Sequence, residues 1–281
     1  MKKYFRLITK TILFLSIFIL SLFIATIIIS HFFISPSNNR NWNDDQKVLP
    51  FAEIQENTVL IHNIRNFSYA STTSYTQNYY DKTFDLNTIK NVWYVVEPFP
   101  GVPGSAHTFL SFEFENNQFV SISVEIRKEK GESFNPLLGL FNKYELTYVV
   151  ADENDVIKLR TNHRKDMVYL YPTKGNKDGF QKLFLDMLHR TNELKENPEF
   201  YNTITNNCTT NIVKHINKVS PKSIPFFTLQ EIFPKYSDTL ACKLGLLDTT
   251  LSCDKIREKY TINGKALLYT NDENFSVKIR E

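Results

Sequence analysis

Cysteine is scarce in this chain of 281 residues, which has three, at positions 208, 242 and 253. No CxxC pair occurs, and no group of His and Cys residues has the spacing of metal ligands, so a structural zinc site is not expected. Because three is an odd number, one thiol is left unpaired. Cys242 and Cys253 could form a disulfide or remain two buried thiols; the intervening LGLLDTTLS is compatible with both, and we favour the thiols.

Acidic residues are missing from the first ten positions, MKKYFRLITK, which carry four positive charges. The formal net charge of the chain is +3, so the remainder is close to neutral, at about −1. That remainder has no basic stripe, and nucleic acid is therefore not an expected partner. Internal repeats and low-complexity tracts are also absent. With 42% apolar residues the chain has enough for one good-sized globular domain.

One long run lacks charged residues altogether: ILFLSIFILSLFIATIIIS, from Ile12 to Ser30. At 1.5 Å per residue a helix of this length spans roughly 28 Å, which is enough to cross the apolar core of a bilayer. A cleavable signal peptide would have a shorter apolar region and a small-residue cleavage site, and the HFFIS that follows contains no A-x-A pattern. We therefore expect an uncleaved membrane anchor.

The charges on either side of this run predict its orientation. MKKYFRLITK is cationic and NNRNWNDD beyond the run is not, so the positive-inside rule places the N-terminus in the cytoplasm. The expected organisation is a cytoplasmic tail (1–10), a transmembrane anchor (11–30), a polar linker broken by prolines (31–50) and an extracytoplasmic domain (51–281). That domain would work beside a membrane surface.

Alternating apolar and polar residues in HTFLSFEFENNQFVSISVEIR, residues 107–127, predict a β-hairpin. The two apolar sets share a face only if the loop has an odd number of residues, and we expect Asn116-Asn117-Gln118. The second face is either a plain solvent-exposed surface or part of a site. Its expected opposed pairs are His107 with Arg127, Phe109 with Glu125, and Ser111 with Ser123.

Other segments complete an α+β pattern, in which an antiparallel sheet packs with helices. NVWYVVEPF and KLRTNHRKDMVYLYP contain strand-like runs rich in Val, Tyr and Leu. FQKLFLDMLHRTNEL predicts a packing helix in which His189 is a surface or core-edge residue and not a catalyst. The apolar residues of this helix that recur at helical spacing are Phe180, Leu183, Phe184, Met187, Leu188 and Leu194.

FYNTITNNCTTNIVKHI, residues 200–216, predicts a helix that begins at Cys208. Asn206 or Asn207 suits the N-cap, because an Asn side chain accepts hydrogen bonds from the free amides of the first turn. The positive end of the helix dipole and these amides favour an anionic sulfur and could hold an oxyanion. Free cysteines are also often simply buried, and the local sequence leaves a packing residue slightly favoured over a nucleophile.

A nucleophilic cysteine needs a base. His215 is seven residues further along the same helix, about 10 Å away, and cannot reach the thiol. His107 follows the shaped loop FPGVPGSA and shares its face with Glu125, and a Cys–His pair oriented by a carboxylate is the usual arrangement for thiol acyl transfer. Arg127 could compete for Glu125 or bind an anionic head group.

The order of these features, His on a strand, a polar residue on the next strand and Cys at a later helix start, resembles the circularly permuted papain-like fold of the lecithin retinol acyltransferase group. A closer resemblance covers about residues 60–260 and is to the Lnb-type lipoprotein N-acyltransferase family of bacteria. The segments that carry it are SAHTFLSFEF, ISVEIRKEKGESFNPLLGL, YELTYVVADENDVIKLRTN, VYLYP and FYNTITNNCTTNI.

The resemblance implies roles for individual residues. The family's essential His and Cys match His107 in AHTFLSF and Cys208 in TNNCTTN, and its SVEIRxE strand matches Ser123 to Glu129. Cys208 would be the nucleophile, His107 the base and Glu125 the third catalytic residue. We also expect substrate contacts from Ser123, Arg127 and Asn207.

The implied activity moves a fatty acyl group from a membrane phospholipid, through a Cys208 thioester, to the N-terminal amine of a lipoprotein. It needs no cofactor, and it would take place on the periplasmic side of the bacterial inner membrane. Two other functions stay open: a papain-like amidase or peptidase acting on cell-wall peptides, and a non-enzymatic anchored binding domain in which Cys208 only packs. The aromatic-rich FNPLLGLFNKYEL either contacts lipid or forms a core loop.

Overall fold

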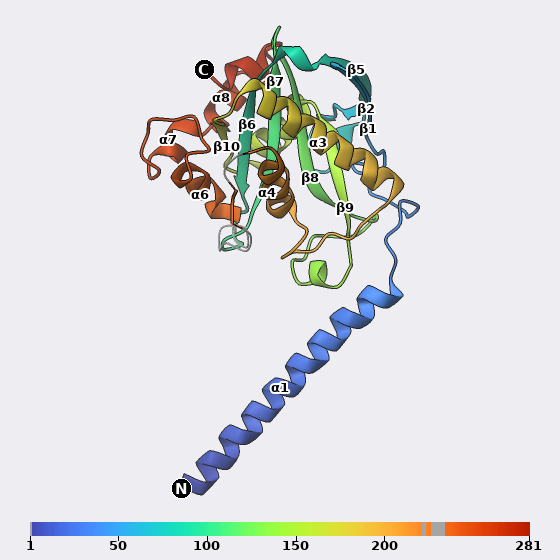
Figure 1. Cartoon of the computed structure of the whole chain (residues 1–281), viewed down its shortest axis with the longest axis vertical. Coiled ribbons are helices and arrows are strands. Elements are labelled where there is room, and N and C mark those ends of the chain that lie inside the picture. Colours follow the sequence, from blue (N-terminus) through green and yellow to red (C-terminus); the bar gives the residue numbers. More distant parts are fainter. Residues whose placement is uncertain (1, 221–222, 226–233) are drawn as a thin grey trace.

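A long helix and a sheet-based domain make up the chain, whose computed structural model describes residues 2–220, 223–225 and 234–281. Helix α1 (Lys2–Phe33) stands away from the domain (Figure 1). Between Tyr4 and Ile29 it is long and apolar enough to cross a membrane, and no part of this apolar stretch is buried in the protein. The run of apolar residues thus forms the helix that the sequence predicts.

The domain is built on a mixed sheet of eight strands in its described part, which agrees with the expected α+β class. The order is β1-β2-β9-β8-β7-β6-β10, with β5 beside β2, and every pairing is antiparallel except that of β2 with β9. The strands are β1 (Phe51–Gln55), β2 (Thr58–Arg65), β5 (Tyr79–Asp85), β6 (Ile89–Pro98), β7 (Ala106–Phe114), β8 (Gln118–Arg127), β9 (Glu145–Ala151) and β10 (Tyr169–Pro172), while β3 (Ser68–Tyr69) and β4 (Tyr75–Thr76) form a separate pair.

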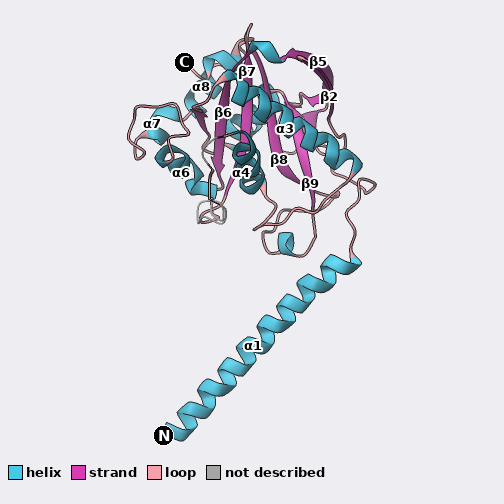
Figure 2. Ribbon diagram, in the orientation of Figure 1, coloured by secondary structure: helices cyan, strands magenta, loops and turns pink. Residues whose placement is uncertain are grey.

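One face of the sheet is covered by α3 (Lys177–Glu196) and α4 (Cys208–Val219), which cross in front of the strands in Figure 2. The apolar stripe expected of α3 is confirmed, because all six of its residues are buried in the main core. Leu110 and Val124 project into the same core from β7 and β8. The C-terminal part of the chain adds η4 (Pro234–Tyr236), α6 (Ser237–Lys243) and α7 (Ile256–Tyr260).

The opposite face of the sheet is also buried, so the alternative of a plain solvent-exposed surface is wrong. Phe109 lies in a second core with Val149 and Val156 and is fully buried. This core is formed with α2 (Glu153–Lys158), α8 (Asn263–Leu268) and α9 (Phe275–Lys278), and the π-helix η3 (Leu159–Arg164) follows α2 directly. Polar residues on this face are therefore enclosed between the sheet and a layer of short helices.

The loop between β7 and β8 has the expected odd number of residues but begins one position earlier. It comprises residues 115–117, and Asn116 and Asn117 both have positive φ, of 55° and 56°. Asn adopts this left-handed conformation more readily than most residues. The turn is centred on the two asparagines, and Gln118 is already part of β8 instead of the loop.

The register of the hairpin is consequently shifted by two residues from the one expected. Phe109 pairs with Ser123 and not with Glu125. An odd loop keeps each side chain on its expected face. Continuing the register by two residues sets His107 level with Glu125, where Arg127 was expected.

The strand expected in KLRTNHRKDMVYLYP is only partly present. Its first half is helical, because Asp152 caps α2 by accepting from the Asn154 N–H, and Val156 and Ile157 then recur with Arg160 at helical spacing on the buried side. The left-handed residue Lys165, with φ of 60°, ends this helical segment. Only Tyr169–Pro172 forms the strand.

Two further segments differ from the sequence-based picture. Cys242 and Cys253 form a disulfide, with 5.8 Å between their Cα atoms, so the preference for two free thiols was wrong. The segment expected as a linker lies against the domain after α1 ends. Trp42 is buried and forms a β-bridge with Glu129. The first strand, β1, begins at Phe51.

Candidate functional site

A cavity of about 240 Å³ lies at the edge of the sheet where β7 begins and β8 ends. His107 and Glu125 contribute side chains to its lining from the two strands, and Cys208 and Asn207 contribute theirs from the start of α4. Loop residues Phe99, Ser105, Phe134, Pro136 and Thr203 complete much of the wall. Residues far apart in the sequence thus meet at one opening.

Cys208 is the first residue of α4, and Asn207 caps the helix as expected. The Asn207 side chain accepts from the Thr210 N–H at 2.9 Å, and the Thr210 hydroxyl accepts from the Asn207 N–H at 2.8 Å. Asn207 also donates to the Thr203 carbonyl at 2.8 Å, which ties the helix start to the preceding loop. In the described chain no acceptor is bound to the N–H groups of Cys208 and Thr209. The helix start therefore has two amides that no described group of the protein satisfies.

His107 is held by a chain of hydrogen bonds within the sheet. Its Nε2 lies 2.7 Å from the Ser123 hydroxyl, which donates to Glu125 Oε1 at 2.8 Å. Because the Ser123 hydroxyl donates its only hydrogen to the carboxylate, its oxygen must accept the hydrogen bond from the Nε2–H of His107. This assigns the proton to Nε2 and leaves the lone pair on Nδ1. Glu125 therefore acts on His107 through Ser123, since its own oxygen is 3.7 Å from Nε2.

Arg160 anchors the carboxylate end of this chain. Its guanidinium donates to Glu125 Oε1 at 3.1 Å and to Glu97 Oε2 at 2.6 Å, and it lies over the ring of Phe109. Burial is the largest single effect and would raise the pKa of Glu125, but Arg160, His107, Arg65 and the Ser123 hydrogen bond together outweigh it and hold that pKa well below its usual range. Glu125 is therefore an anion at neutral pH.

Burial lowers the pKa of His107 from 6.5 to about 4, and the nearby Arg160 cation acts in the same direction while Glu125 opposes it. The imidazole is therefore neutral at pH 7. A neutral imidazole with its lone pair on Nδ1 can accept a proton, which is the property that a general base requires.

Cys208 is a buried free thiol, 7% exposed, and it lines the cavity. The Sγ atom lies 3.8 Å from the hydroxyl of Thr209. Among the described residues no hydrogen bond joins the thiol to the imidazole of His107. The two groups share one cavity and approach it from different walls.

Two residues expected to contact substrate lie elsewhere. Ser123 is fully buried and is absent from the cavity lining, so its place is behind His107. Arg127 donates to the backbone carbonyls of Gln46 and Lys47 at 3.0 and 2.9 Å and stacks on Trp42. Because the register is shifted by two residues, Arg127 does not lie opposite His107. Its side chain instead binds the segment after α1 to the sheet.

Arg160 was not anticipated as a member of this network, because its segment reads as a strand. Asp152 is the sequence feature that could have revealed this role of Arg160. As an N-cap it predicts a helix, and in a helix Arg160 lies on the same face as Val156, four residues earlier. His215 is bound elsewhere, as expected: Nε2 lies 2.7 Å from the Tyr148 hydroxyl and Nδ1 lies 2.6 Å from Asp186.

Exposed apolar side chains surround the mouth of the cavity. Phe134 is itself part of the lining, and the adjacent loop is joined to the opposite rim where the Thr203 hydroxyl donates to the Pro136 carbonyl at 2.7 Å. Further along this loop, the Phe141 ring packs edge-on against Phe23 of α1, with 5.3 Å between ring centroids. The exposed fractions lie between 38% and 66% for Val102, Phe134, Leu137, Leu138 and Ile204.

Comparison with known proteins assigns the chain to a family. The family model described as the Lnb N-terminal periplasmic domain matches residues 75–235, which is more than half of the chain and includes both His107 and Cys208. No curated protein and no solved structure gives a match. One helix of the described chain is suited to cross a membrane. The chain therefore belongs to the Lnb family, as a membrane-associated protein with a periplasmic domain.

Proposed function

We propose that this protein is a cysteine-dependent acyltransferase that moves a fatty acyl group from a membrane phospholipid to the N-terminal amine of a lipoprotein. The observation that carries the proposal is the shared cavity, in which the free thiol of Cys208 meets a neutral His107. Family membership supports the same chemistry, because the region that matches the family model contains both residues.

The first half of the reaction forms a thioester. Nδ1 of His107 takes the proton of the Cys208 thiol, and the sulfur attacks the ester carbonyl of the phospholipid. The N–H groups of Cys208 and Thr209 donate to the oxyanion. The C–S bond forms, the C–O bond breaks, and the lysophospholipid oxygen leaves with the proton that His107 returns.

The second half transfers the acyl group to nitrogen. The free amine of the lipoprotein attacks the thioester carbonyl, the C–N bond forms and the C–S bond breaks. His107 accepts the proton from the amine and returns it to sulfur, which restores the thiol of Cys208. Ser123 and Glu125 keep the proton on Nε2, so Nδ1 is the proton acceptor in both halves of the reaction.

The rim of the cavity suits a substrate that lies in a membrane. Phe23 is six residues before Ile29, the end of the apolar span, so the contact with Phe141 lies about 9 Å along the helix inside that span. The loop with Leu137 and Leu138 therefore reaches into the leaflet when α1 crosses the bilayer. A phospholipid ester can then approach Cys208 without leaving the membrane.

Complementation tests the proposal. A bacterial strain that lacks its own lipoprotein N-acyltransferase receives the wild type, Cys208→Ala or His107→Ala, and mass spectrometry reads the lipoprotein N-terminus. We expect acylation with the wild type and none with either variant. His189→Ala, which changes an exposed histidine of α3, is the matched control and should acylate normally. Acylation by both cavity variants would contradict the proposal.

A second measurement separates acyl transfer from cell-wall hydrolysis. Purified protein is incubated with phospholipid vesicles and its intact mass is recorded. Acyl transfer predicts a thioester on Cys208 that hydroxylamine removes. Release of cell-wall peptides with no thioester would favour the amidase instead. Failure of iodoacetamide to label Cys208 faster than an ordinary thiol, with function intact in Cys208→Ser, would favour the binding domain.

A further inference from the structure

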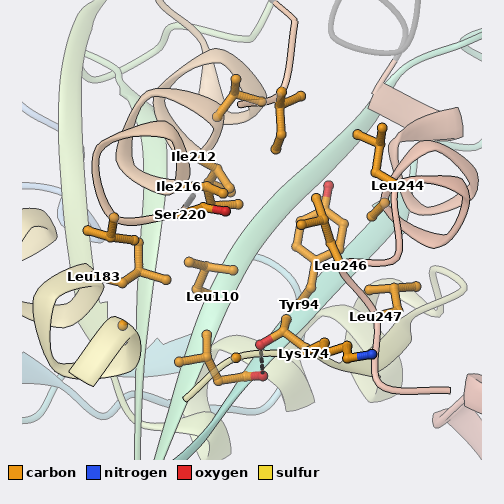
Figure 3. Close-up of a pocket in the computed structure, with 18 of the residues that line it drawn as sticks. Tyr94, Leu110, Lys174, Leu183, Ile212, Ile216, Ser220, Leu244, Leu246 and Leu247 are labelled. Carbon is orange, nitrogen blue, oxygen red and sulfur yellow. Dashed lines mark hydrogen bonds between the residues drawn. The ribbon is translucent and has the colours of Figure 1, made fainter. Parts of the chain in front are cut away.

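A second, larger cavity of about 480 Å³ lies between α4, the strands β6 and β7, and the segment that includes α6 and residues 244–247. In Figure 3 the side chains of Ile212 and Ile216 enter it from α4, Leu110 and Tyr94 from the sheet, and Leu244 from the opposite side. Its volume is that of a small-molecule binding site. Protein interiors rarely contain voids much larger than a water molecule, so a cavity of this size calls for an occupant.

The lining of this cavity is mostly apolar. Lys174 is the only charged residue among its described lining residues, and it is exposed to solvent. Leucine and isoleucine side chains dominate the rest. Such a wall offers dispersion contacts along its length and few hydrogen-bonding groups, which matches a hydrocarbon chain and not a peptide or a sugar.

Helix α4 connects this cavity to Cys208. Cys208 and Ile212 are four residues apart and share a face of the helix, one turn or about 6 Å from each other. Ile216 and Ser220 continue the lining for about two more turns. The apolar cavity therefore begins one helical turn from the thiol and follows the same helix away from it.

Thr209 stands at the junction of the two cavities. Its hydroxyl is 3.8 Å from the Cys208 sulfur and 3.2 Å from the Thr108 hydroxyl, and the residue also lines the apolar cavity. Nearby, the Tyr94 hydroxyl pairs with Ser237 at 2.7 Å, and both of these residues line the apolar cavity as well. Hydroxyl side chains, which can rotate, therefore lie where the apolar cavity comes closest to Cys208 along α4.

We infer that the apolar cavity holds the fatty acyl chain while its carbonyl carbon is bound to Cys208. This inference rests on the proposed acyl transfer and specifies where the donor's chain lies. A methylene group is about as large as a water molecule, whose share of liquid volume is about 30 Å³, so 480 Å³ accommodates on the order of a dozen methylene groups. The cavity then determines which chain lengths are transferred, and the smaller cavity stays open to the head group and the amine.

Trp substitution at Ile216 tests this assignment. Full-length protein in detergent is given phospholipids that differ only in acyl-chain length, and thioester formation on Cys208 is followed by intact mass. Ile216→Trp fills the cavity two turns from the thiol, so we expect palmitoyl transfer to slow by roughly tenfold and decanoyl transfer to be unchanged. Lys214→Trp adds the same bulk on the exposed side of α4 and should keep the wild-type chain-length profile. Val219→Phe is a smaller change further along the cavity, and it should slow the transfer of only the longest acyl chains.

A binding measurement keeps this assignment separate from the chemistry. Cys208→Ala protein, which forms no thioester, is titrated with a fluorescent long-chain fatty acid. We expect saturable binding that Ile216→Trp weakens and Lys214→Trp does not. A wild-type chain-length profile in Ile216→Trp would overturn the inference and leave acyl transfer standing. If the wild type forms no thioester with any donor, acyl transfer fails, and the titration alone decides whether the cavity binds acyl chains.

Discussion

Ser123 positions the base, because it links the Nε2–H of His107 to the carboxylate of Glu125. Ser123→Ala leaves a buried N–H without its acceptor and allows the imidazole to change tautomer. We expect thioester formation to slow by roughly tenfold, the value of one buried hydrogen bond. The pH profile of the rate should shift as well, because the imidazole loses the hydrogen bond that links it to the Glu125 carboxylate.

Ser121→Ala is the matched control for this change. Ser121 lies two residues earlier on β8, on the same face, is fully buried, and its hydroxyl has no hydrogen-bond partner in the described chain. Its variant should keep the wild-type rate and pH profile. Equal losses in the two variants would indicate that Ser123 only packs.

Burial of His107 predicts a pH dependence of stability. Its pKa is about 4 in the folded protein and 6.5 when exposed, so between these values the unfolded chain binds the proton more readily. The free energy of unfolding should therefore decrease as the pH falls from 6.5 to about 4, with a contribution from His107 on the order of 3 kcal/mol. Urea denaturation across this range measures the decrease.

His107→Gln should lose this contribution and give a flatter profile than the wild type. The comparison is needed because burial also lowers the pKa of His215, while the carboxylates of Asp81 and Glu53 raise the pKa of His62. Glu125, whose pKa lies well below its usual range, supplies stability that is lost only at lower pH. Identical slopes in His107→Gln and the wild type would show that the imidazole is solvated.

At the scale of single elements, α4 presents both the thiol and the apolar stripe, and its first turn depends on Asn207. Asn207→Ala removes the acceptor for the Thr210 N–H and the bond to the Thr203 carbonyl. We expect a loss of about 1 kcal/mol in the free energy of unfolding and slower thioester formation, because the amides near Cys208 lose their orientation. Denaturation and intact-mass kinetics measure the two effects.

Asn207→Asp is the corresponding control. An Asp side chain keeps the acceptor that caps the helix and loses only the amide donor to Thr203. Its stability should remain close to that of the wild type. A loss of stability in Asn207→Asp as large as in Asn207→Ala would assign the effect to the loop contact and not to the cap.

At the scale of the whole molecule, the loop between β8 and β9 is expected to enter the membrane beside α1. Leu138→Asp places a charge on this loop, where it would have to be removed from water. We expect acylation of vesicle phospholipid to fall by at least about tenfold, while thioester formation from a donor dissolved in detergent is retained.

Leu267→Asp tests whether any exposed apolar residue would give the same result. Leu267 lies on α8, outside the loop between β8 and β9, and is 68% exposed, more than the 43% of Leu138. This variant should act on vesicles as the wild type does. Equal defects at both positions would argue against insertion of this particular loop.

Much of the architecture follows from local patterns in the chain. The length and composition of the apolar run up to Ser30 indicate a membrane-crossing helix or a signal sequence. The apolar stripe of α3 and the N-cap of α4 are predicted from residues that are neighbours in the sequence. The odd loop of the β7–β8 hairpin likewise assigns His107 and Glu125 to one face without any tertiary contact. Those features depend on the spacing of apolar residues along the chain and on the residues of a helix's first turn, which are local properties.

Only the tertiary structure decided which of these residues act together. The register of the hairpin depends on two asparagines with positive φ, and it exchanged Arg127 for Glu125 opposite His107. Two further contacts join segments that no local pattern relates to each other. They are the disulfide between Cys242 and Cys253 and the ion pair between Arg160 and Glu125. The sequence by itself determined the apolar N-terminal helix, the sheet with its helices and the family. The packing of distant segments decided the hydrogen-bond chain behind His107 and the apolar cavity beside Cys208, because both arise from contacts that no local pattern encodes.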